Sequence, residues 1–303
     1  MKKKLFSLCA IILVLSLALV GCSSSSSSDD SSSNGSSGSK ITKKDNNVTI
    51  GVADNFISLD PHDTNDTLSY SAEKTMLEGL VGFDKDMKIV PVLAESYEAS
   101  DDAKTFTFKL RKGIKFQDGT DFNAEAVKVN IDRLADPNSK LKRHSLFAIV
   151  KETQVVDDYT VKVILSEPFG AMINNFAHPA AMILSPAALE KYGDDIGKHP
   201  VGTGPYTFVE WKPGDHLTVK KNDDYWQDGK PKLDQITFKP VPENGSRIAM
   251  LQTGEADFIY PVPTESAKSV NGKNGVEVVN DPSIIVQYLS MNTQKKPFND
   301  VKV

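Results

Sequence analysis

The chain has 303 residues, of which 25% are charged, and its formal net charge is −5 at pH 7. An acidic chain lacks the clustered Lys and Arg that neutralise phosphates, so nucleic-acid binding is excluded from the expected functions. Its two cysteines, Cys9 and Cys22, and its five histidines show neither metal-ligand spacing nor an HExxH motif, so we expect no metal site and no cofactor.

Residues 1–21 have the pattern of an export signal. Three lysines at positions 2–4 are followed by an uncharged apolar run, 5–20, and by Gly21-Cys22. The run is short for a membrane span, which needs about 20 apolar residues, and a basic start with a small residue at the cleavage site is typical of secretion. An uncleaved N-terminal anchor is the alternative. The pattern resembles a lipobox, in which Cys22 becomes the first residue and carries lipid.

Residues 22–47 are expected to be the lipidated cysteine and a flexible tether. The stretch 23–39 holds twelve serines, two glycines, one asparagine and two aspartates, too little apolar surface to offset the entropy of ordering. Acyl chains contribute about 0.8 kcal/mol per buried CH₂, so several on Cys22 would hold a protein at a membrane. We therefore expect an extracytoplasmic protein, lipid-anchored to the outer face of a Gram-positive cell membrane or membrane-associated in a periplasm.

Strands and helices are interspersed from residue 48 onward. The run 105–110 alternates apolar and polar residues, as a half-buried strand does. Asn123 stands where an N-cap belongs, before apolar residues at Val127, Ile131 and Leu134 that share one helical face. The mixture predicts an α/β domain rather than a helical bundle or a sandwich. Strands are predicted at 48–52, 105–110, 159–163, 206–211, 216–221, 235–241, 256–260, 276–279 and 284–291, and helices at 68–80, 124–135, 186–193 and from 247.

No stretch has the pattern of a catalytic or nucleotide-binding motif. Residues 202–206, Gly-Thr-Gly-Pro-Tyr, lack the Lys-Ser/Thr pair of a phosphate loop, and a strand rather than a helix N-terminus is expected to follow them. We interpret them as a tight turn where the chain crosses between substructures. No GxSxG elbow occurs. The protein is therefore not expected to be an enzyme.

Several stretches carry a resemblance to a known family. They are 58–62 (SLDPH), 76–83 (MLEGLVGF), 93–119 with its TFTFKLRKGIKF core, 200–206 (PVGTGPY), 222–226 (NDDYW) and 297–303 (PFNDVKV). Together they resemble the extracytoplasmic solute-binding proteins of the peptide, dipeptide and nickel import family, known as family 5. The stretches 250–257 and 261–263 are most similar to its glutathione- or dipeptide-binding branch.

The resemblance implies a periplasmic-binding-protein-like fold of the large peptide-binding type II class, in which two lobes close on a ligand. Residues 48–278 would form the first lobe, with an inserted subdomain at about 80–200, and 279–303 the crossover and the start of the second lobe. Family members continue well beyond Val303, so we expect a C-terminally truncated sequence.

The same resemblance implies a substrate-binding lipoprotein of an ABC importer, a monomer that captures di- or oligopeptides or glutathione for a permease and its ATPase subunits. The alternatives are a sensor or receptor of the same fold, a binder of nickel or a metal chelate and, least favoured, a surface-anchored hydrolase. No arginine is assigned to a ligand carboxylate. The expected ligand-binding residues follow the first strand, namely His62, Asp63, Thr64, Thr67, Ser69 and Tyr70, with Asn175, Phe176 and His178 as a second group.

Overall fold

The computed structural model describes residues 46–280 and 288–302. The predicted export signal, Cys22 and almost all of the predicted tether lie outside the described residues, as does the first half of the predicted strand 284–291. The chain divides into two units, residues 1–40 and 41–303, and the description below concerns the second. No helix within the described ranges is both long and apolar enough to cross a bilayer.

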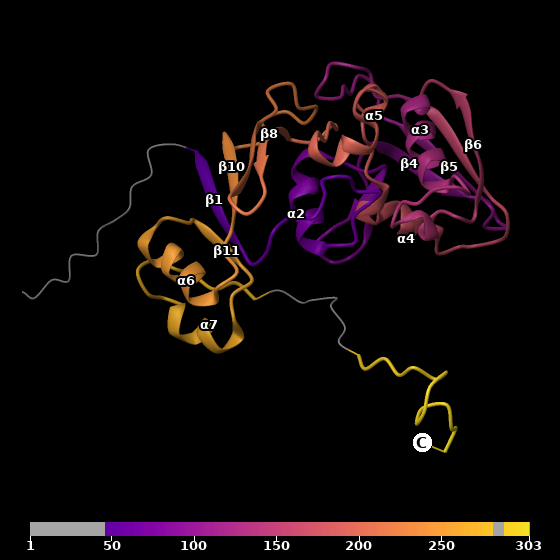
Figure 1. Ribbon diagram of the computed structural model, residues 1–303. Coiled ribbons are helices and arrows are strands. Elements are labelled where there is room, and N and C mark those ends of the chain that lie inside the picture. The colour runs from indigo at the N-terminus through magenta and orange to yellow at the C-terminus, as the bar shows by residue number, and fades with distance from the viewer. Residues whose placement is uncertain (1–45, 281–287, 303) are drawn as a thin grey trace, which may run out of the picture. The chain divides into compact units, whose positions relative to one another are not determined.

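A five-stranded mixed sheet has the order β11-β1-β10-β9-β8 (Figure 1). Strand β1 is parallel to both of its neighbours, while β9 runs antiparallel to β10 and β8. The carboxyl ends of the three parallel strands therefore meet at one edge of the sheet. The strands are β1 (Asn47–Val52), β8 (Tyr206–Lys212), β9 (His216–Lys221), β10 (Gln235–Pro240) and β11 (Phe258–Tyr260).

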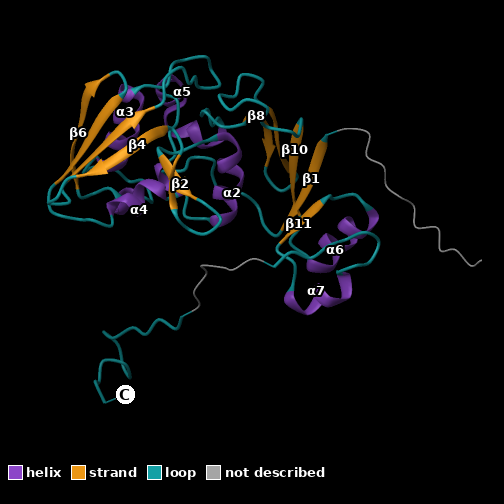
Figure 2. Ribbon diagram, turned by 180° about the vertical axis from the view of Figure 1, so that it is seen from behind, coloured by secondary structure: helices purple, strands orange, loops and turns teal. Residues whose placement is uncertain are grey.

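A separate antiparallel sheet has the order β4-β5-β7-β6 (Figure 2). Phe106 and Phe108 of β5 are fully buried in a core that also holds residues of helix α3 and helix α4, as their alternation with polar residues predicts. Asn123 caps α3 by accepting a hydrogen bond from the Ala126 N–H. The elements are β4 (Ala94–Ala99), β5 (Thr105–Leu110), α3 (Ala124–Ala135), β6 (Val150–Asp157), β7 (Thr160–Leu165) and α4 (Met172–Ala177).

The remaining elements connect the sheets or cover them. Helix α2 is capped by Asp66, which accepts hydrogen bonds from the N–H groups of Leu68 and Ser69. Ser185 caps α5, and Gly193 ends it with a φ of 51°. These elements are α2 (Thr67–Met76), β2 (Val81–Phe83), β3 (Ile89–Pro91), α5 (Pro186–Tyr192), α6 (Asn244–Thr253) and α7 (Thr264–Val270), with 3₁₀ turns η1 (His144–Leu146), η2 (Pro179–Ala181) and η3 (Gly193–Lys198).

Three predicted elements differ from the structure: the helix at 68–80 and the strands at 276–279 and 284–291, the last because its described residues, 288–291, are not in a strand. The helix predicted at 68–80 ends at Met76, because Leu77 is already extended, with φ −122° and ψ 148°. Leu80 continued the i, i+4 series by coincidence: Met76 packs in the core beside the five-stranded sheet, and Leu80 in that of the four-stranded sheet. The strand predicted at 276–279 is not formed, and the Val278 N–H instead donates to the Asn271 side chain.

Glycines 202 and 204 let two parts of the chain touch closely. A Cβ on Gly204 would lie 2.5 Å from the carbonyl carbon of Met76, and one on Gly202 would lie 2.6 Å from the Met76 oxygen. The Gln117 amide completes the junction by donating to the carbonyls of Met76, Gly204 and Tyr206 at 2.9, 3.2 and 2.8 Å. The glycines thus serve backbone packing between the sheets, while the lobe boundaries stay a prediction.

Candidate functional site

The loop that follows β1 is held by a buried ionic network. Arg133 of α3 donates to both carboxylate oxygens of Asp60, at 2.7 and 3.1 Å. The same guanidinium lies 2.7 Å from Nδ1 of His62, whose Nε2 lies 3.1 Å from the Met182 carbonyl oxygen. Both His62 nitrogens are therefore engaged, Nδ1 as acceptor and Nε2 as donor.

The protonation states within this network follow from burial. Burial lowers the pKa of His62 to about 4, and the Arg133 charge adds to this effect while Asp60 opposes it. The ring is therefore neutral near pH 7. Burial alone would raise the pKa of Asp60, but the hydrogen bond from Arg133 and the nearby charges outweigh it and hold that pKa below its usual value. A charged pair and a neutral imidazole therefore connect this loop to α3 and to Met182.

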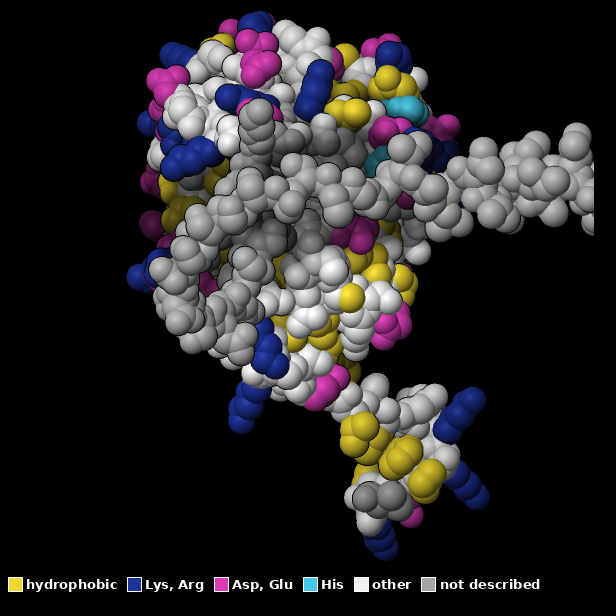
Figure 3. All heavy atoms as spheres, turned by 90° about the vertical axis from the view of Figure 1, so that its left-hand side faces the viewer, with side chains coloured by type: hydrophobic (Ala, Val, Ile, Leu, Met, Phe, Trp, Pro, Cys, Tyr) yellow, Lys and Arg dark blue, Asp and Glu magenta, His cyan; other side chains and the backbone are white. Residues whose placement is uncertain are grey.

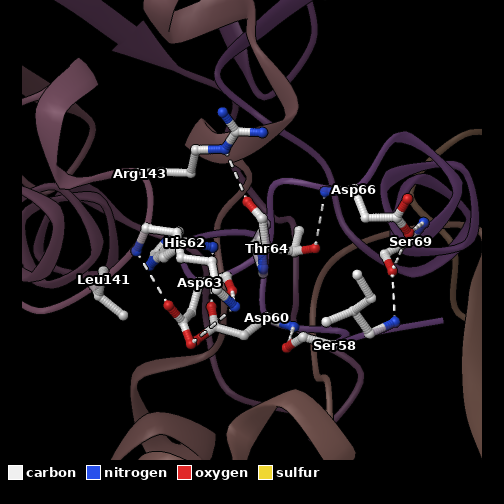
Figure 4. A network of polar contacts seen from close by, with 12 residues as sticks. Ser58, Asp60, His62, Asp63, Thr64, Asp66, Ser69, Leu141 and Arg143 are labelled. Atoms are coloured by element: carbon white, nitrogen blue, oxygen red, sulfur yellow. Dashed lines mark hydrogen bonds and ion pairs between the residues drawn. The ribbon is translucent and has the colours of Figure 1, made fainter. Parts of the chain in front are cut away.

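Three further predicted site residues are buried in the same loop and the start of α2, and two of them, Thr64 and Ser69, are drawn in Figure 4. The Ser69 hydroxyl donates to Asp66 at 2.7 Å and accepts from the Ile57 N–H at 3.0 Å. Thr64 accepts from the Asp66 N–H, and the Tyr70 hydroxyl donates to the Thr64 carbonyl at 2.8 Å. Thr64, Ser69 and Tyr70 thus shape the loop from within.

Asp63 and Thr67 have more access to solvent. Thr67 is exposed, and Asp63 is partly exposed while its carboxylate accepts from the Lys142 N–H at 3.1 Å. The ammonium group of Lys142 donates to the Asp63 carbonyl oxygen at 2.8 Å. Of the six residues predicted from the first loop, these two have the side chains most open to a ligand.

Arg143 is a candidate that the sequence did not single out. Its Nε donates to the Thr64 carbonyl at 2.8 Å and to the Tyr70 hydroxyl at 2.7 Å. The Tyr70 ring also lies against the guanidinium, 5.4 Å from centroid to Cζ. Neither terminal nitrogen, Nη1 or Nη2, has a hydrogen-bond partner among the residues that the structure describes, and Figure 4 shows them pointing away from the loop.

The structure brings His178 of the second predicted group to the same place. Its ring packs edge-on against Tyr70, with centroids 5.4 Å apart. Nδ1 accepts from the Ala180 N–H at 3.0 Å, so the neutral ring carries its proton on Nε2. Burial, helped by the charges of Arg143 and Lys74, lowers the pKa of His178 to about 4. His178 therefore presents a neutral N–H donor in a positive environment.

The other two residues of that group lie elsewhere. Phe176 is fully buried, with its ring centroid 4.9 Å from that of Phe108 and 5.8 Å from that of Phe147. Asn175 donates to the Leu146 carbonyl at 2.8 Å. Both side chains are used in packing this core and do not reach the surroundings of Arg143 through any described contact.

The carboxyl ends of the parallel strands form a second candidate surface. In open α/β sheets, ligands bind outside the carboxyl ends of the strands. Here buried Arg247 ties these ends together, donating to the carbonyls of Val241, Pro242 and Pro261 at 2.8, 3.1 and 3.1 Å. Hydrophobic side chains lie among charged ones on the face seen in Figure 3. The exposed residues that follow β1 or end β11 are Asp54, Asn55, Ile57 and Tyr260.

The arrangement around Arg143 fits a carboxylate or another anion. A guanidinium with two free terminal nitrogens can bind a carboxylate through two parallel hydrogen bonds. Its position is fixed by Thr64 and Tyr70, whose own loop is fixed by the Asp60–Arg133–His62 network. No group of three or more His, Cys, Asp or Glu within the described ranges has the geometry of a metal site.

The sequence is similar to one family of bacterial solute-binding proteins. Residues 88–303 match the family described as "Bacterial extracellular solute-binding proteins, family 5 Middle". Glutathione-binding protein GsiB of Escherichia coli O6:K15:H31 is 54% identical over 257 residues, which cover 85% of this chain and 50% of that protein. GsiB of Pectobacterium atrosepticum is 53% identical over 84% of this chain and 49% of its own length. The chain spans about half the length of these relatives.

The fold is similar to those of binding proteins with solved structures. AgaA, in complex with agropinic acid, from A. tumefaciens R10 is 38% identical with a TM-score of 0.70, over 74% of this chain and 45% of that one. The oligopeptide-binding protein AppA from Bacillus subtilis, in complex with a nonapeptide, is 28% identical with a TM-score of 0.69 over the same shares. The chain has the mixed helix and sheet fold of these binding proteins, and it belongs to family 5 of the bacterial extracellular solute-binding proteins.

Proposed function

We propose that the protein is the substrate-binding component of an ABC importer that captures glutathione or short peptides outside the membrane and delivers them to a permease. The observation that carries the proposal is the Arg143 guanidinium, whose terminal nitrogens have no partner among the described residues while its Nε is fixed by two hydrogen bonds. Free peptides end in a carboxylate, and glutathione bears two. A preorganised guanidinium binds such a group at low entropic cost.

The predicted site residues divide into two roles under this proposal. Asp63 and Thr67, which have access to solvent, are proposed to face the ligand, and His178 to offer its Nε2 proton to the carboxylate that Arg143 binds. The buried His62, Thr64, Ser69 and Tyr70 are proposed to hold Arg143 and the loop in place. A rigid support of this kind raises affinity because less freedom is lost on binding.

The finer parts of the proposal concern the whole protein. We propose a monomer that performs no chemistry on its ligand, held at the membrane by lipid on Cys22, with a permease and ATPase subunits as partners. GsiB relatives are named for glutathione, which supports the ligand class. A sensor of the same fold would bind the same ligands, but deleting its gene would leave ligand uptake intact, whereas loss of an importer component abolishes uptake.

Calorimetry on the full chain tests the proposed site. The ligands are glutathione, the dipeptide Met-Leu and Met-Leu amide, which lacks the terminal carboxylate. Arg143→Ala should weaken binding of the two free acids by roughly 10- to 150-fold, the equivalent of a charged hydrogen bond of about 1.5–3 kcal/mol. Lys140→Ala is the matched control, since it removes a positive charge at an exposed position three residues away and leaves the guanidinium in place. The proposal is wrong if Arg143→Ala binds the free acids as tightly as the unmodified protein.

A further inference from the structure

Glu73 on α2 is a buried carboxyl group that nothing in the proposed function uses. Its side chain is fully buried, and neither carboxyl oxygen has a hydrogen-bond partner among the described residues. An ionised carboxylate without partners is very costly to bury, so the group takes up a proton instead. Burial accordingly raises the pKa of Glu73 well above its usual value, and the charges of Asp60 and Asp66 raise it further.

Within the described part of the chain, the charges of Asp60, Asp66 and Arg143 act on Glu73, and Glu73 in turn raises the pKa of Tyr70. The two aspartates and Tyr70 already have hydrogen-bond or ion-pair partners. Asp60 is paired with Arg133, and Asp66 caps α2 through the N–H groups of Leu68 and Ser69. Tyr70, one helical turn earlier, donates its proton to the Thr64 carbonyl. The remaining group is Arg143, which lowers the pKa of Glu73 and whose Nη1 and Nη2 are unpaired within the described part of the chain.

Among the described residues, Arg143 is therefore the cation that acts on Glu73 and still has donors without a hydrogen-bond partner. Tyr70 bridges the two residues: it shares α2 with Glu73 at i, i+3 spacing, on the same helical face, and it accepts a hydrogen bond from Arg143 Nε at 2.7 Å. For the guanidinium to reach Glu73, it would have to turn about this contact so that its terminal nitrogens move towards α2. Ionised Glu73 attracts the guanidinium and favours that movement, whereas protonated Glu73 has no charge to attract it.

We propose that Glu73 is a proton-controlled competitor for Arg143, leaving the guanidinium free for an anionic ligand when protonated and drawing it towards α2 when ionised. The proposal rests on the proposed function for the identity of the ligand carboxylate, but not for the competition itself. Anion binding and protonation of Glu73 then favour one another. A bound carboxylate neutralises Arg143 and so raises the proton affinity of Glu73, which makes binding take up protons where free Glu73 is partly ionised.

The test on the ligand-free full chain is an NMR pH titration that follows the Glu73 carboxyl carbon and the Arg143 guanidinium nitrogens. We expect the Arg143 resonances to shift with the same midpoint as Glu73, and this shift to vanish in Glu73→Gln, which mimics the protonated side chain. Glu95→Gln, at an exposed position, is the matched control and should leave the shift unchanged. Arg143 resonances that stay constant while Glu73 titrates, or that still shift in Glu73→Gln, would overturn the proposal.

Calorimetry with glutathione adds the functional readout. In buffers of different ionisation enthalpy, binding should take up protons near the Glu73 midpoint, and affinity should fall by up to about tenfold per pH unit above it. Glu73→Gln should abolish both effects. If glutathione does not bind at any pH, the proposed ligand is wrong, while the ligand-free titration still decides whether Glu73 and Arg143 compete.

Discussion

The indole Nε1 of Trp226 donates a 2.8 Å hydrogen bond to Oε2 of Glu78, although 148 residues separate them in the chain. Thr203 donates to the same oxygen at 2.9 Å, and the Tyr225 hydroxyl donates to Oε1 at 2.7 Å. Arg111 lies 5.3 Å from the Trp226 ring centroid and adds a cation–π contact. The Glu78 carboxylate therefore connects the segment after α2 to the turn before β8 and to the loop after β9 through hydrogen bonds.

Removing that carboxylate should destabilise the fold. Glu78→Ala leaves three donors unpaired in a largely buried place, and we expect the free energy of unfolding to fall by about 2–4 kcal/mol. Urea denaturation of the full chain measures it. Glu95→Ala, on exposed β4, should change stability by less than about 0.5 kcal/mol. Equal midpoints for the two variants would show that the Glu78 contacts contribute little.

A methyl group at Gly204 should be poorly tolerated. Its Cβ would lie within 2.6 Å of both the carbon and the oxygen of the Met76 carbonyl, which are backbone atoms that cannot rotate away. We expect Gly204→Ala to lower the free energy of unfolding by about 3 kcal/mol or more. Gly170→Ala is the control, because its Cβ would meet its nearest neighbour at 3.9 Å. Thermal unfolding of both variants checks the difference, and a mild effect at Gly204 would contradict the close packing.

Acid should destabilise the protein partly through His62. Its pKa in the fold is about 4, against a usual value of 6.5. As pH falls from 6.5 towards 4, His62 becomes protonated in the unfolded chain but stays neutral in the folded chain. The free energy of unfolding therefore falls by up to about 3 kcal/mol. His178, with a pKa of about 4 but more exposed, should contribute a smaller share.

Replacing His62 checks that assignment. His62→Gln should flatten the dependence of stability on pH in this window, measured by chemical denaturation at half-unit pH steps. His199→Gln, at an exposed position, serves as the control and should keep the slope of the unmodified protein. An unchanged slope in His62→Gln would mean that other groups carry the acid sensitivity.

Asn130 offers a test of the core between α3 and the segment before α5. Its side chain is fully buried, accepts from the Leu184 N–H at 2.9 Å, and donates to the Leu184 and Ala126 carbonyls. Asn130→Leu introduces a side chain of similar size but leaves the Leu184 N–H and carbonyl without these hydrogen-bond partners. We expect a loss of about 2–4 kcal/mol on urea denaturation. A neutral result would show that water or a shifted backbone replaces the amide.

Local sequence signals predicted much of the fold. The alternation in β5 and the cap at Asn123 are properties of neighbouring residues, and both are confirmed. Strands β4 and β6 were not predicted, because their exposed outer residues leave little apolar alternation to detect. They form because β5 and β7 offer them partners, which is information held elsewhere in the chain.

The candidate site was predictable only in part. The loop after the first strand was identified, but the sequence could not tell which of its polar residues face inwards. His62 is predicted to bind the ligand, and the sequence gives no sign that Arg133, 71 residues away, lies against its Nδ1; its part in ligand binding stays a prediction. Arg143 was not assigned because its role depends on a contact with the Thr64 carbonyl, 79 residues earlier. Such long-range pairings leave no periodic trace in the sequence.

The Gln117 amide has a mechanical consequence. Its three carbonyl partners lie at the end of α2, in the turn before β8 and in β8 itself, while Gln117 follows β5 of the other sheet. A twist of one sheet against the other would have to break these bonds together with those of Glu78. The two sheets should therefore move as one rigid body. Any hinge motion that encloses a ligand must then occur in segments outside this junction.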